Sequence, residues 1–400
     1  MTGSLTPGRA SRATTRSLAA TPSMAPMSSA AFALALTMTV AGSALFAAPA
    51  GAQSATTPAA KSVAKSAAAG TATTSPAATA RGKAWVMPRT PDGHPDLQGN
   101  WTNATLTPLE RTAGLGQALT PEQVVKIEKI RSDTVEQLSK QSDPNRPAPP
   151  KGGDGSTGAA GNVGGYNYFW IDAGNQMATV NGERRSSLIV DPPDGRVPAL
   201  TPAGRERQTE RFRRMRQFGE FDNPENRPLA ERCIMSFGSN AGPPMLPNYF
   251  YNNNYTFVQT KDHVLMMTEM VHDTRIIRVG KGERLSAQVR PWMGDSHGRW
   301  EGDTLVVETT NFHPQQLFRG SSDNMKVTER FHRADENTIL YRFTVDDPTT
   351  FTRTFSGEVP FVKLNELIYE YACHEGNYAL SNILSGERAR EREAAVTPKP

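Results

Sequence analysis

Short segments of alternating apolar and polar residues fill the C-terminal part of the chain. Between residues 338 and 345, Ile339, Tyr341, Phe343 and Val345 occupy every second position, so they would share one face of a strand. Turn sequences such as Glu301-Gly302-Asp303 separate these segments. The pattern predicts eight consecutive strands, at residues 255–259, 264–270, 275–279, 304–310, 325–331, 338–345, 351–359 and 367–373.

A series of strands at such close spacing predicts a mainly β protein. We expect residues 249–390 to form an antiparallel up-and-down β-barrel, because closure of a sheet removes its exposed edges. Residues 83–248 are rich in Pro and Gly, and predict an irregular, partly helical N-terminal half. Its two predicted helices, 121–140 and 203–218, each follow a Thr-Pro pair, which places an N-cap residue before Pro at the first helical position.

The N-terminus carries the pattern of an export signal. Arg9, Arg12 and Arg16 precede an apolar run at residues 30–48, which ends in Ala50-Gly51-Ala52. A basic region, an apolar region and a small-residue cleavage site in this order predict a signal peptide at 1–52, and a retained membrane anchor is the alternative. Residues 53–82, mostly Ala, Thr, Ser and Pro, predict a disordered linker, and 391–400 a disordered tail. We therefore expect a periplasmic or secreted protein.

Cleavage of the signal changes the charge of the protein. The whole chain has 44 Lys+Arg and 40 Asp+Glu, and loss of the three signal arginines leaves 44 − 3 = 41 basic residues against 40 acidic ones. A near-neutral protein lacks the basic footprint of a nucleic-acid partner. The arginines of the second helix alternate with Glu206 and Glu210, which favours a solvated, salt-bridged face. We expect no nucleic acid and, after cleavage, no membrane as a partner.

The chain contains two cysteines, Cys233 and Cys373. An even number of cysteines in an oxidising compartment favours a disulfide bond. Two buried thiols are the alternative.

Two resemblances rest on short stretches of sequence. Gly99-Asn100-Trp101 resembles the G-x-W signature of lipocalins and the wider calycin group, in which the Trp plugs one end of the barrel. Gly298-Arg299-Trp300, followed by the turn at 301–303, is similar to the hairpins of lipocalin-like barrels. The resemblance implies a calycin-like barrel. The mature chain also resembles a group of secreted bacterial proteins of unassigned function, over the stretches 91–97, 191–196, 294–295 and 371–377.

Two charged residues are predicted to face the barrel interior. Glu329 alternates with Val327 and Phe331, and Arg353 shares its face with two phenylalanines. A charge among apolar side chains is costly unless it is paired. Glu329 and Arg353 would therefore either pair with each other or bind a polar part of a ligand.

The densest group of titratable side chains lies at a predicted strand end and consists of Glu269, His272, Asp273 and Arg275. A His beside carboxylates suits proton transfer, because its pKa lies near neutrality. We expect His272 to act as acid or base, Asp273 or Glu269 to orient it, and Arg275 to bind an anionic group. The alternative is a tight turn in which Asp273 caps the backbone.

A second polar group follows the last predicted strand. His374 comes directly after Cys373, and a disulfide there would hold it rigidly. Glu370 lies four residues earlier, on the same side of a continuing strand, and Asn377 follows closely. We expect His374 to join the catalytic group, and Glu370 and Asn377 to bind ligand. A polar turn at a strand exit is the alternative.

Signatures of cofactor chemistry are missing from the sequence. It has no H-E-x-x-H pattern or close His pair, and no P-loop, dinucleotide or G-x-S-x-G motif. We expect no cofactor, and a metal only if His272, His374 and a carboxylate converge. The leading hypothesis is an enzyme that acts on a small molecule by acid–base chemistry, as a lyase, isomerase or hydrolase. The alternatives are a carrier of an apolar or glycosylated compound and an envelope interaction protein.

Overall fold

The computed structural model describes residues 85–140, 171–236, 240–316 and 318–396. The predicted signal peptide and linker lie outside these residues, as does the end of the chain from 397. Within the described ranges, no helix combines the length and the apolar character that a membrane span requires.

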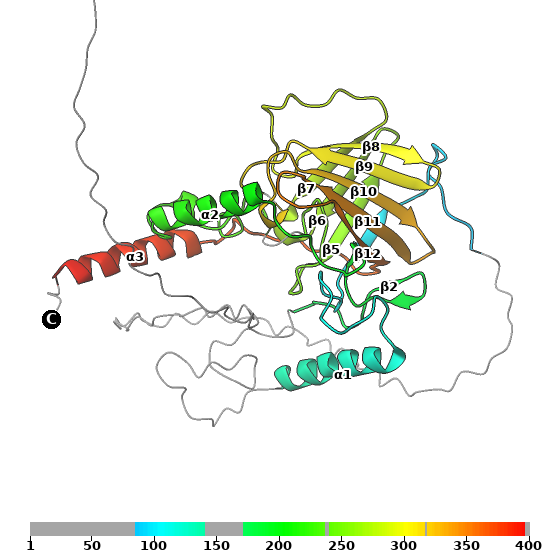
Figure 1. Ribbon diagram of the computed structural model, residues 1–400, viewed down its shortest axis with the longest axis horizontal. Helices are drawn as coiled ribbons and strands as arrows, with labels where there is room; N and C mark the ends of the chain where they lie inside the picture. Colours follow the sequence, from blue (N-terminus) through cyan, green and yellow to red (C-terminus); the bar gives the residue numbers. More distant parts are fainter. Residues whose placement is uncertain (1–84, 141–170, 237–239, 317, 397–400) are drawn as a thin grey trace, which may run out of the picture. The chain divides into compact units, whose positions relative to one another are not determined.

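The described chain folds around a closed β-barrel (Figure 1). Nine strands follow one another around it, and the last pairs with the first, Trp101 lying opposite Lys363. β4 (Ile189–Asp191) pairs with β12 outside this ring. The barrel strands are β1 (Gly99–Thr102), β5 (Asn254–Gln259), β6 (His263–Thr268), β7 (Thr274–Val279), β8 (Asp295–Glu301), β9 (Thr304–Thr310), β10 (Lys326–Arg333), β11 (Thr338–Asp346) and β12 (Phe355–Lys363).

The barrel is mixed rather than purely antiparallel. β7 and β8 run parallel and pair only through Arg278 with His297 and Val279 with Gly298. The segment 280–294 crosses back between them, whereas a hairpin would have reversed the chain. The prediction of an antiparallel order throughout is therefore wrong at this seam, and β8 was not predicted because its polar sequence lacks apolar alternation.

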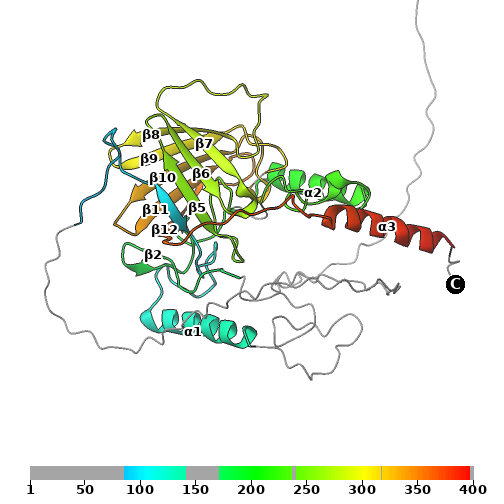
Figure 2. The ribbon, with the colours of Figure 1, turned by 180° about the vertical axis from the view of Figure 1, so that it is seen from behind.

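The predicted strand at 367–373 is wrong. Residues 364–378 form an irregular segment, here called the strap. At its start the strap is fixed to β1, since the amide of Leu364 donates to the carbonyl of Asn100 over 2.8 Å, and at its middle His272 bonds the carbonyl of Tyr371. Figure 2 shows the strap running from β12 across the barrel toward α3. Its apolar residues imitate strand alternation, but Leu367 and Tyr369 are each 77% exposed.

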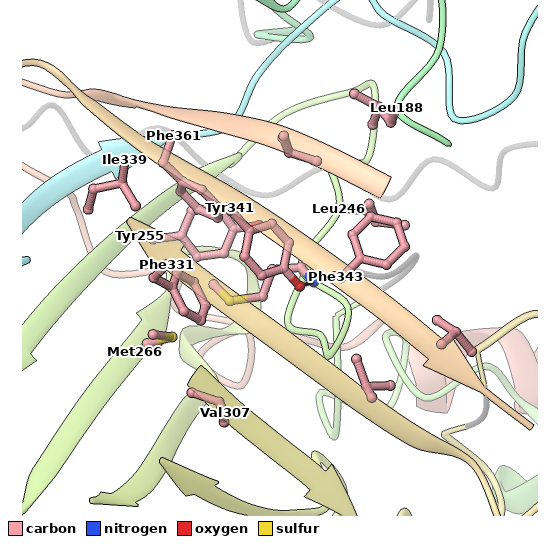
Figure 3. Close-up of a cluster of buried hydrophobic side chains, with 14 of the residues drawn as sticks. Leu188, Leu246, Tyr255, Met266, Val307, Phe331, Ile339, Tyr341, Phe343 and Phe361 are labelled. Carbon is pink, nitrogen blue, oxygen red and sulfur yellow. Dashed lines mark hydrogen bonds between the residues drawn. The ribbon is translucent and has the colours of Figure 1, made fainter. Parts of the chain in front are cut away.

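The barrel interior is an aromatic core (Figure 3). Tyr341 and Phe361 meet edge to face at 5.6 Å between ring centroids, and the ring centroid of Phe331 lies 4.9 Å from that of Tyr341. Trp101 is buried, and its indole N–H donates to the carbonyl of Leu97 over 3.0 Å. Burial of such rings provides much of the favourable free energy of folding.

The helices lie outside the barrel ring. α1 (Pro121–Leu138) begins after the predicted N-cap residue, Thr120, which forms a capping box with Gln123, and α2 (Pro202–Gln217) begins after Thr201 as predicted. α3 (Ala379–Val396) was not predicted, and it replaces both the end of the expected barrel segment and part of the expected tail. The short elements are β2 (Thr179–Val180), β3 (Glu183–Arg184), η2 (Pro224–Asn226), η3 (Met270–His272) and η4 (Phe318–Gly320).

Candidate functional site: a cleft at the parallel seam

The parallel seam opens into a cleft. Because β7 and β8 pair only at Arg278–Val279, their N-terminal halves are not hydrogen-bonded to each other. Between them lies a cleft of about 550 Å³, lined by residues 272–276 of one side and 291–296 of the other, with Ile234, Met235, Arg278 and Leu285. A hollow of this volume accommodates a small molecule.

The backbone that leads into the cleft is strained. Val271 has φ 60° and His272 has φ 49°, both in the left-handed region. A β-branched residue rarely adopts this conformation, which costs about 1–3 kcal/mol. The amide of Thr268 closes the turn by donating to the carbonyl of Asp273 over 2.8 Å. The turn buries Val271 while His272 stays exposed, and it places both His272 and Asp273 on the cleft wall.

Among the titratable residues that line the cleft, Asp273 has the pKa that differs most from its ordinary value. Its carboxyl group is partly buried, and this loss of solvation raises its pKa from 3.8 to about 6. The amide of Ser236 donates to Oδ2 over 3.2 Å, and this bond and the nearby His272 both lower the pKa, but by less than burial raises it. Asp273 therefore gains and loses a proton near neutral pH, as an acid–base catalyst requires.

His272 has a defined tautomer. Its Nδ1 lies 3.0 Å from the carbonyl oxygen of Tyr371, which accepts only, so in the neutral ring Nδ1 carries the proton and Nε2 is an acceptor. The ring centroid of His374 is 6.3 Å from that of His272. The two histidines thus lie close together, although His374 does not line the cleft.

The disulfide bond brings the strap to this region. Cys233 and Cys373 are bonded, with their Cα atoms 5.7 Å apart, which confirms the predicted pair. Asn377 donates to the Sγ of Cys233 over 3.2 Å, and its own Oδ1 accepts from the amide of Ala379 at the start of α3. Glu370 is exposed, and no strand continues from it to His374, so the predicted common strand face of these two residues is wrong.

Glu269 lies beside the strained turn. Burial raises the pKa of its carboxyl group, which accepts a hydrogen bond from Asn254 Nδ2 over 2.8 Å. Its contacts are to Asn254 rather than to the ring of His272. Glu269 is thus close to the cleft without lining it.

Glu329 and Arg275 form a buried ion pair inside the barrel. Glu329 is fully buried, and its two oxygens lie 2.6 and 3.0 Å from the guanidinium nitrogens of Arg275. Tyr341 donates to Glu329 over 2.9 Å, and the amide of Met245 donates to the Tyr341 hydroxyl. Arg275 reaches the cleft at its edge, but its charge is already matched by Glu329.

Arg353 does not face the interior, contrary to prediction. Residues 352–354 form a bend and β12 begins only at Phe355, so the two-residue alternation that placed Arg353 inside the barrel does not apply. Its side chain is 52% exposed and pairs with Asp191 over 2.9 Å. Arg353 is therefore neither the partner of Glu329 nor part of the cleft.

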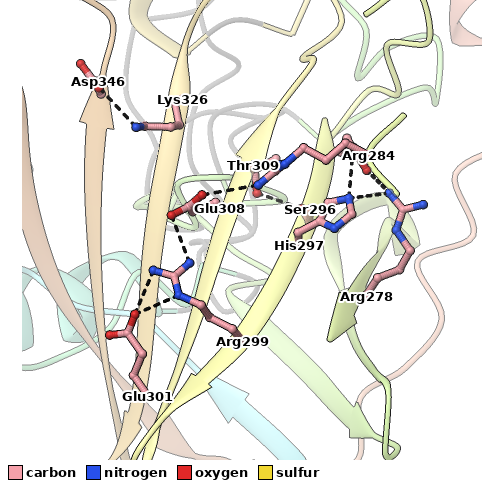
Figure 4. A network of polar contacts seen from close by, with 11 residues as sticks. Arg278, Arg284, Ser296, His297, Arg299, Glu301, Glu308, Thr309, Lys326 and Asp346 are labelled. Carbon is pink, nitrogen blue, oxygen red and sulfur yellow. Dashed lines mark hydrogen bonds and ion pairs between the residues drawn. The ribbon is translucent and has the colours of Figure 1, made fainter. Parts of the chain in front are cut away.

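A polar network that the sequence did not reveal links β7 to β8. Arg278 pairs with Asp295 and donates to Nε2 of His297 over 2.8 Å, and the amide of Leu285 donates to Asp295 over 2.9 Å. Figure 4 shows His297 between Arg278 and Arg284. Burial lowers the pKa of His297, so it stays neutral. Gly294-Asp295 is one of the stretches that resemble secreted bacterial proteins, but the positions of these residues in the sequence do not indicate the network.

No group of three or more His, Cys, Asp or Glu side chains that could hold a metal ion occurs within residues 85–140, 171–236, 240–316 and 318–396. Comparisons of the chain with protein-family models, curated proteins and solved structures each find no match. The cleft is therefore the basis for a proposed function.

Proposed function

We propose that the protein is an enzyme that moves a proton on a small organic molecule bound in the cleft at the parallel seam. The observation that carries the proposal is Asp273, a residue with a pKa of about 6 on the wall of a cleft of about 550 Å³. A carboxyl group with that pKa serves as base or acid at neutral pH.

His272 supplies the second group of the proposed chemistry. Its Nε2 is an acceptor, because the backbone carbonyl of Tyr371 holds the proton on Nδ1. Asp273 would take a proton from the substrate and return it at another atom, or give it to a leaving group. His272 would bind a hydroxyl or enol of the substrate, and the ring of His374 lies beside it. Lyase, isomerase and hydrolase reactions all use such steps.

The proposal extends to fold type and location. We propose a calycin-like barrel, supported by the burial of Trp101 in β1, although the parallel seam departs from an up-and-down order. We also propose that the protein is exported to the periplasm or beyond. The bond between Cys233 and Cys373 supports this location, because disulfides persist in oxidising compartments.

A carrier is the second candidate function. The wall of the cleft formed by residues 291–296 contains Trp292 and Met293, and Met235 adds a further apolar side chain, which suits an apolar ligand. A carrier would bind its ligand without changing it, and would not need a carboxyl group that titrates near pH 6.

Proton exchange in D₂O tests the proposed enzyme even while its substrate is unidentified. The probes are a panel of small carboxylic acids, ketones and lactones, followed by ¹H NMR for protein-dependent deuterium incorporation or turnover. We expect the wild-type protein to exchange or convert at least one probe and Asp273→Asn to lose the activity by about 100-fold or more.

Asp262→Asn is the matched control, because Asp262 also neighbours a histidine, His263, but lies on an exposed turn outside the cleft. It should retain full activity. Binding of a probe without exchange by the wild-type protein would favour the carrier. Equal activity of Asp273→Asn and the wild type would refute the role of Asp273.

A further inference from the structure

The cleft has one apolar wall and one polar wall. Leu285, Trp292 and Met293 lie on the segment that connects β7 to β8, and Ile234 and Met235 precede Ser236, whose amide donates to Asp273. Arg278 of β7 and Asp295 of β8 provide charged groups, as does Asp273, which directly precedes β7. A ligand that fills the cleft would therefore need both an apolar body and a polar end.

Trp292 is held in place as a flat apolar surface. The centroid of its ring lies 3.8 Å from that of His313, at an angle of 35° between the planes. Burial lowers the pKa of His313, so this neighbour is neutral at pH 7 and does not place a positive charge behind the indole. One side of Trp292 is thus covered, while the side chain still lines the cleft. An indole fixed in this way suits stacking with a planar ring.

Arg278, on the polar wall, has N–H groups that are not used in hydrogen bonds within the described chain. Its Nη2 is used by Asp295 and His297, whereas its Nη1 and Nε have no hydrogen-bond partner in the part of the chain that the structure describes. The side chain is 35% exposed and lines the cleft. Two free N–H groups of one guanidinium match the two oxygens of a carboxylate.

Arg275, the other cation of the cleft, has only its Nε without a hydrogen-bond partner among the described residues, and that atom is buried. Both terminal nitrogens of Arg275 bind Glu329, and this pair is buried. Asp295 is likewise occupied by Arg278 and by the amide of Leu285. Arg278 is therefore the group best placed to bind an incoming anion.

We propose that the cleft takes a small carboxylate with a planar, aromatic body, whose carboxylate binds Arg278 and whose ring stacks on Trp292. This inference rests on the proposed function, since it names the substrate class of the same site. A monocyclic aromatic acid fits well within about 550 Å³. The reactive part of such a substrate would lie between Arg278 and Trp292, beside Asp273.

Binding of three related probes tests the inference, with isothermal titration calorimetry on the full mature chain. Phenylacetate has both features, benzyl alcohol has only the ring, and acetate has only the charge. We expect phenylacetate to bind at least about tenfold more tightly than either of the others, because it alone uses both walls. Equal affinity for phenylacetate and acetate would overturn the inference.

Variants assign the two contacts. Arg278→Gln should weaken phenylacetate binding about tenfold or more and leave benzyl alcohol unchanged, because it removes only the carboxylate contact. Trp292→Leu should weaken both ring-containing probes. Arg278→Lys keeps the charge next to Asp295 but not the two-pronged donor, so it should show an intermediate loss and guards against misfolding of the Gln variant. Arg353→Gln, outside the cleft, is the matched control.

The outcomes separate this inference from the proposed function. Selective phenylacetate binding without proton exchange on any probe would refute the enzyme and leave the ligand class standing. Asp273-dependent exchange without preference for phenylacetate would refute the ligand class alone. If Arg278→Gln and Arg353→Gln bind phenylacetate as the wild type does, Arg278 is not the anion contact.

Discussion

The two sides of the barrel differ in how their strands are joined. β10, β11 and β12 pair antiparallel along their lengths, and their inner faces carry the aromatic core. At the seam, β7 and β8 share only the pairs at Arg278 and Val279. The well-paired side is filled by buried aromatic side chains, while the poorly paired side has a cleft, a strained turn and a carboxyl group of altered pKa. Stability and candidate chemistry therefore lie in different parts of one barrel.

The buried ion pair connects the two sides, so breaking it should have the largest effect. Glu329→Gln leaves Arg275 charged and without its partner in the barrel interior, which should lower the free energy of unfolding by about 3–5 kcal/mol. Urea denaturation followed by tryptophan fluorescence measures this loss. Arg353→Gln, which breaks an exposed pair with Asp191, should cost less than about 1 kcal/mol. Equal losses in the two variants would contradict the burial argument.

Removal of the disulfide bond should have the next largest effect. Cys233→Ser with Cys373→Ser frees a loop whose ends are 140 residues apart, and should lower the free energy of unfolding by about 2–4 kcal/mol. The wild-type protein in the presence of a reductant should behave as the double variant does. A double variant as stable as the oxidised wild type would show that the strap is held without the bond.

Substitution of two glycines compares how well the two sides of the barrel tolerate an added Cβ atom. A Cβ at Gly357 of β12 would clash with the ring of Phe343 and lie 2.9 Å from the carbonyl of Leu188, so Gly357→Ala should cost about 2–3 kcal/mol. A Cβ at Gly298 of β8 would meet Ile277 at 3.0 Å, where the nearest atom is a side-chain methyl group. Gly298→Ala should cost about 1 kcal/mol or less. Thermal unfolding checks the order of the two losses, and the reverse order would contradict the comparison.

Asp273→Asn should stabilise the protein in a pH-dependent manner. Folding raises the pKa of Asp273 from 3.8 to about 6, so the folded state binds the proton more tightly, and the cost of ionisation grows as the pH rises from about 4 to 6. The Asn variant avoids this cost and should be about 2 kcal/mol more stable at about pH 7.5, with no gain below about pH 4. Denaturation at these two pH values is the measurement. A gain of equal size at both would point to a cause other than ionisation.

The regular half of the barrel was predictable from sequence, because its central strands β10 and β11 alternate buried apolar and more exposed polar residues. β11 is the clearest example, with Ile339, Tyr341, Phe343 and Val345 all buried. The strap carries a similar apolar pattern at 367–373 but crosses the barrel and leaves Leu367 exposed, which periodicity alone cannot distinguish from a strand. The opposite error occurred at β8, which is a strand although its mostly polar sequence lacks the alternation that predicts one.

The candidate site was only partly predictable. His272 and Asp273 stand together in the sequence, so their proximity to each other required no fold. Trp292 and Arg278 belong to the cleft because β7 and β8 diverge, and no local pattern indicates a parallel pair joined by so long a connection. Arg353 was misplaced because a bend at 352–354 shifted the alternation before β12.

The protonation of Asp273 is the property on which the proposed function depends most. The ¹³C chemical shift of its carboxyl carbon can be followed between about pH 3 and pH 9 by NMR, with Asp273→Asn to assign the signal. We expect a midpoint near 6, because burial beside the cleft raises the pKa of this group to about 6. A midpoint near 4, the value of an exposed aspartate, would contradict the proposal that Asp273 transfers protons at neutral pH.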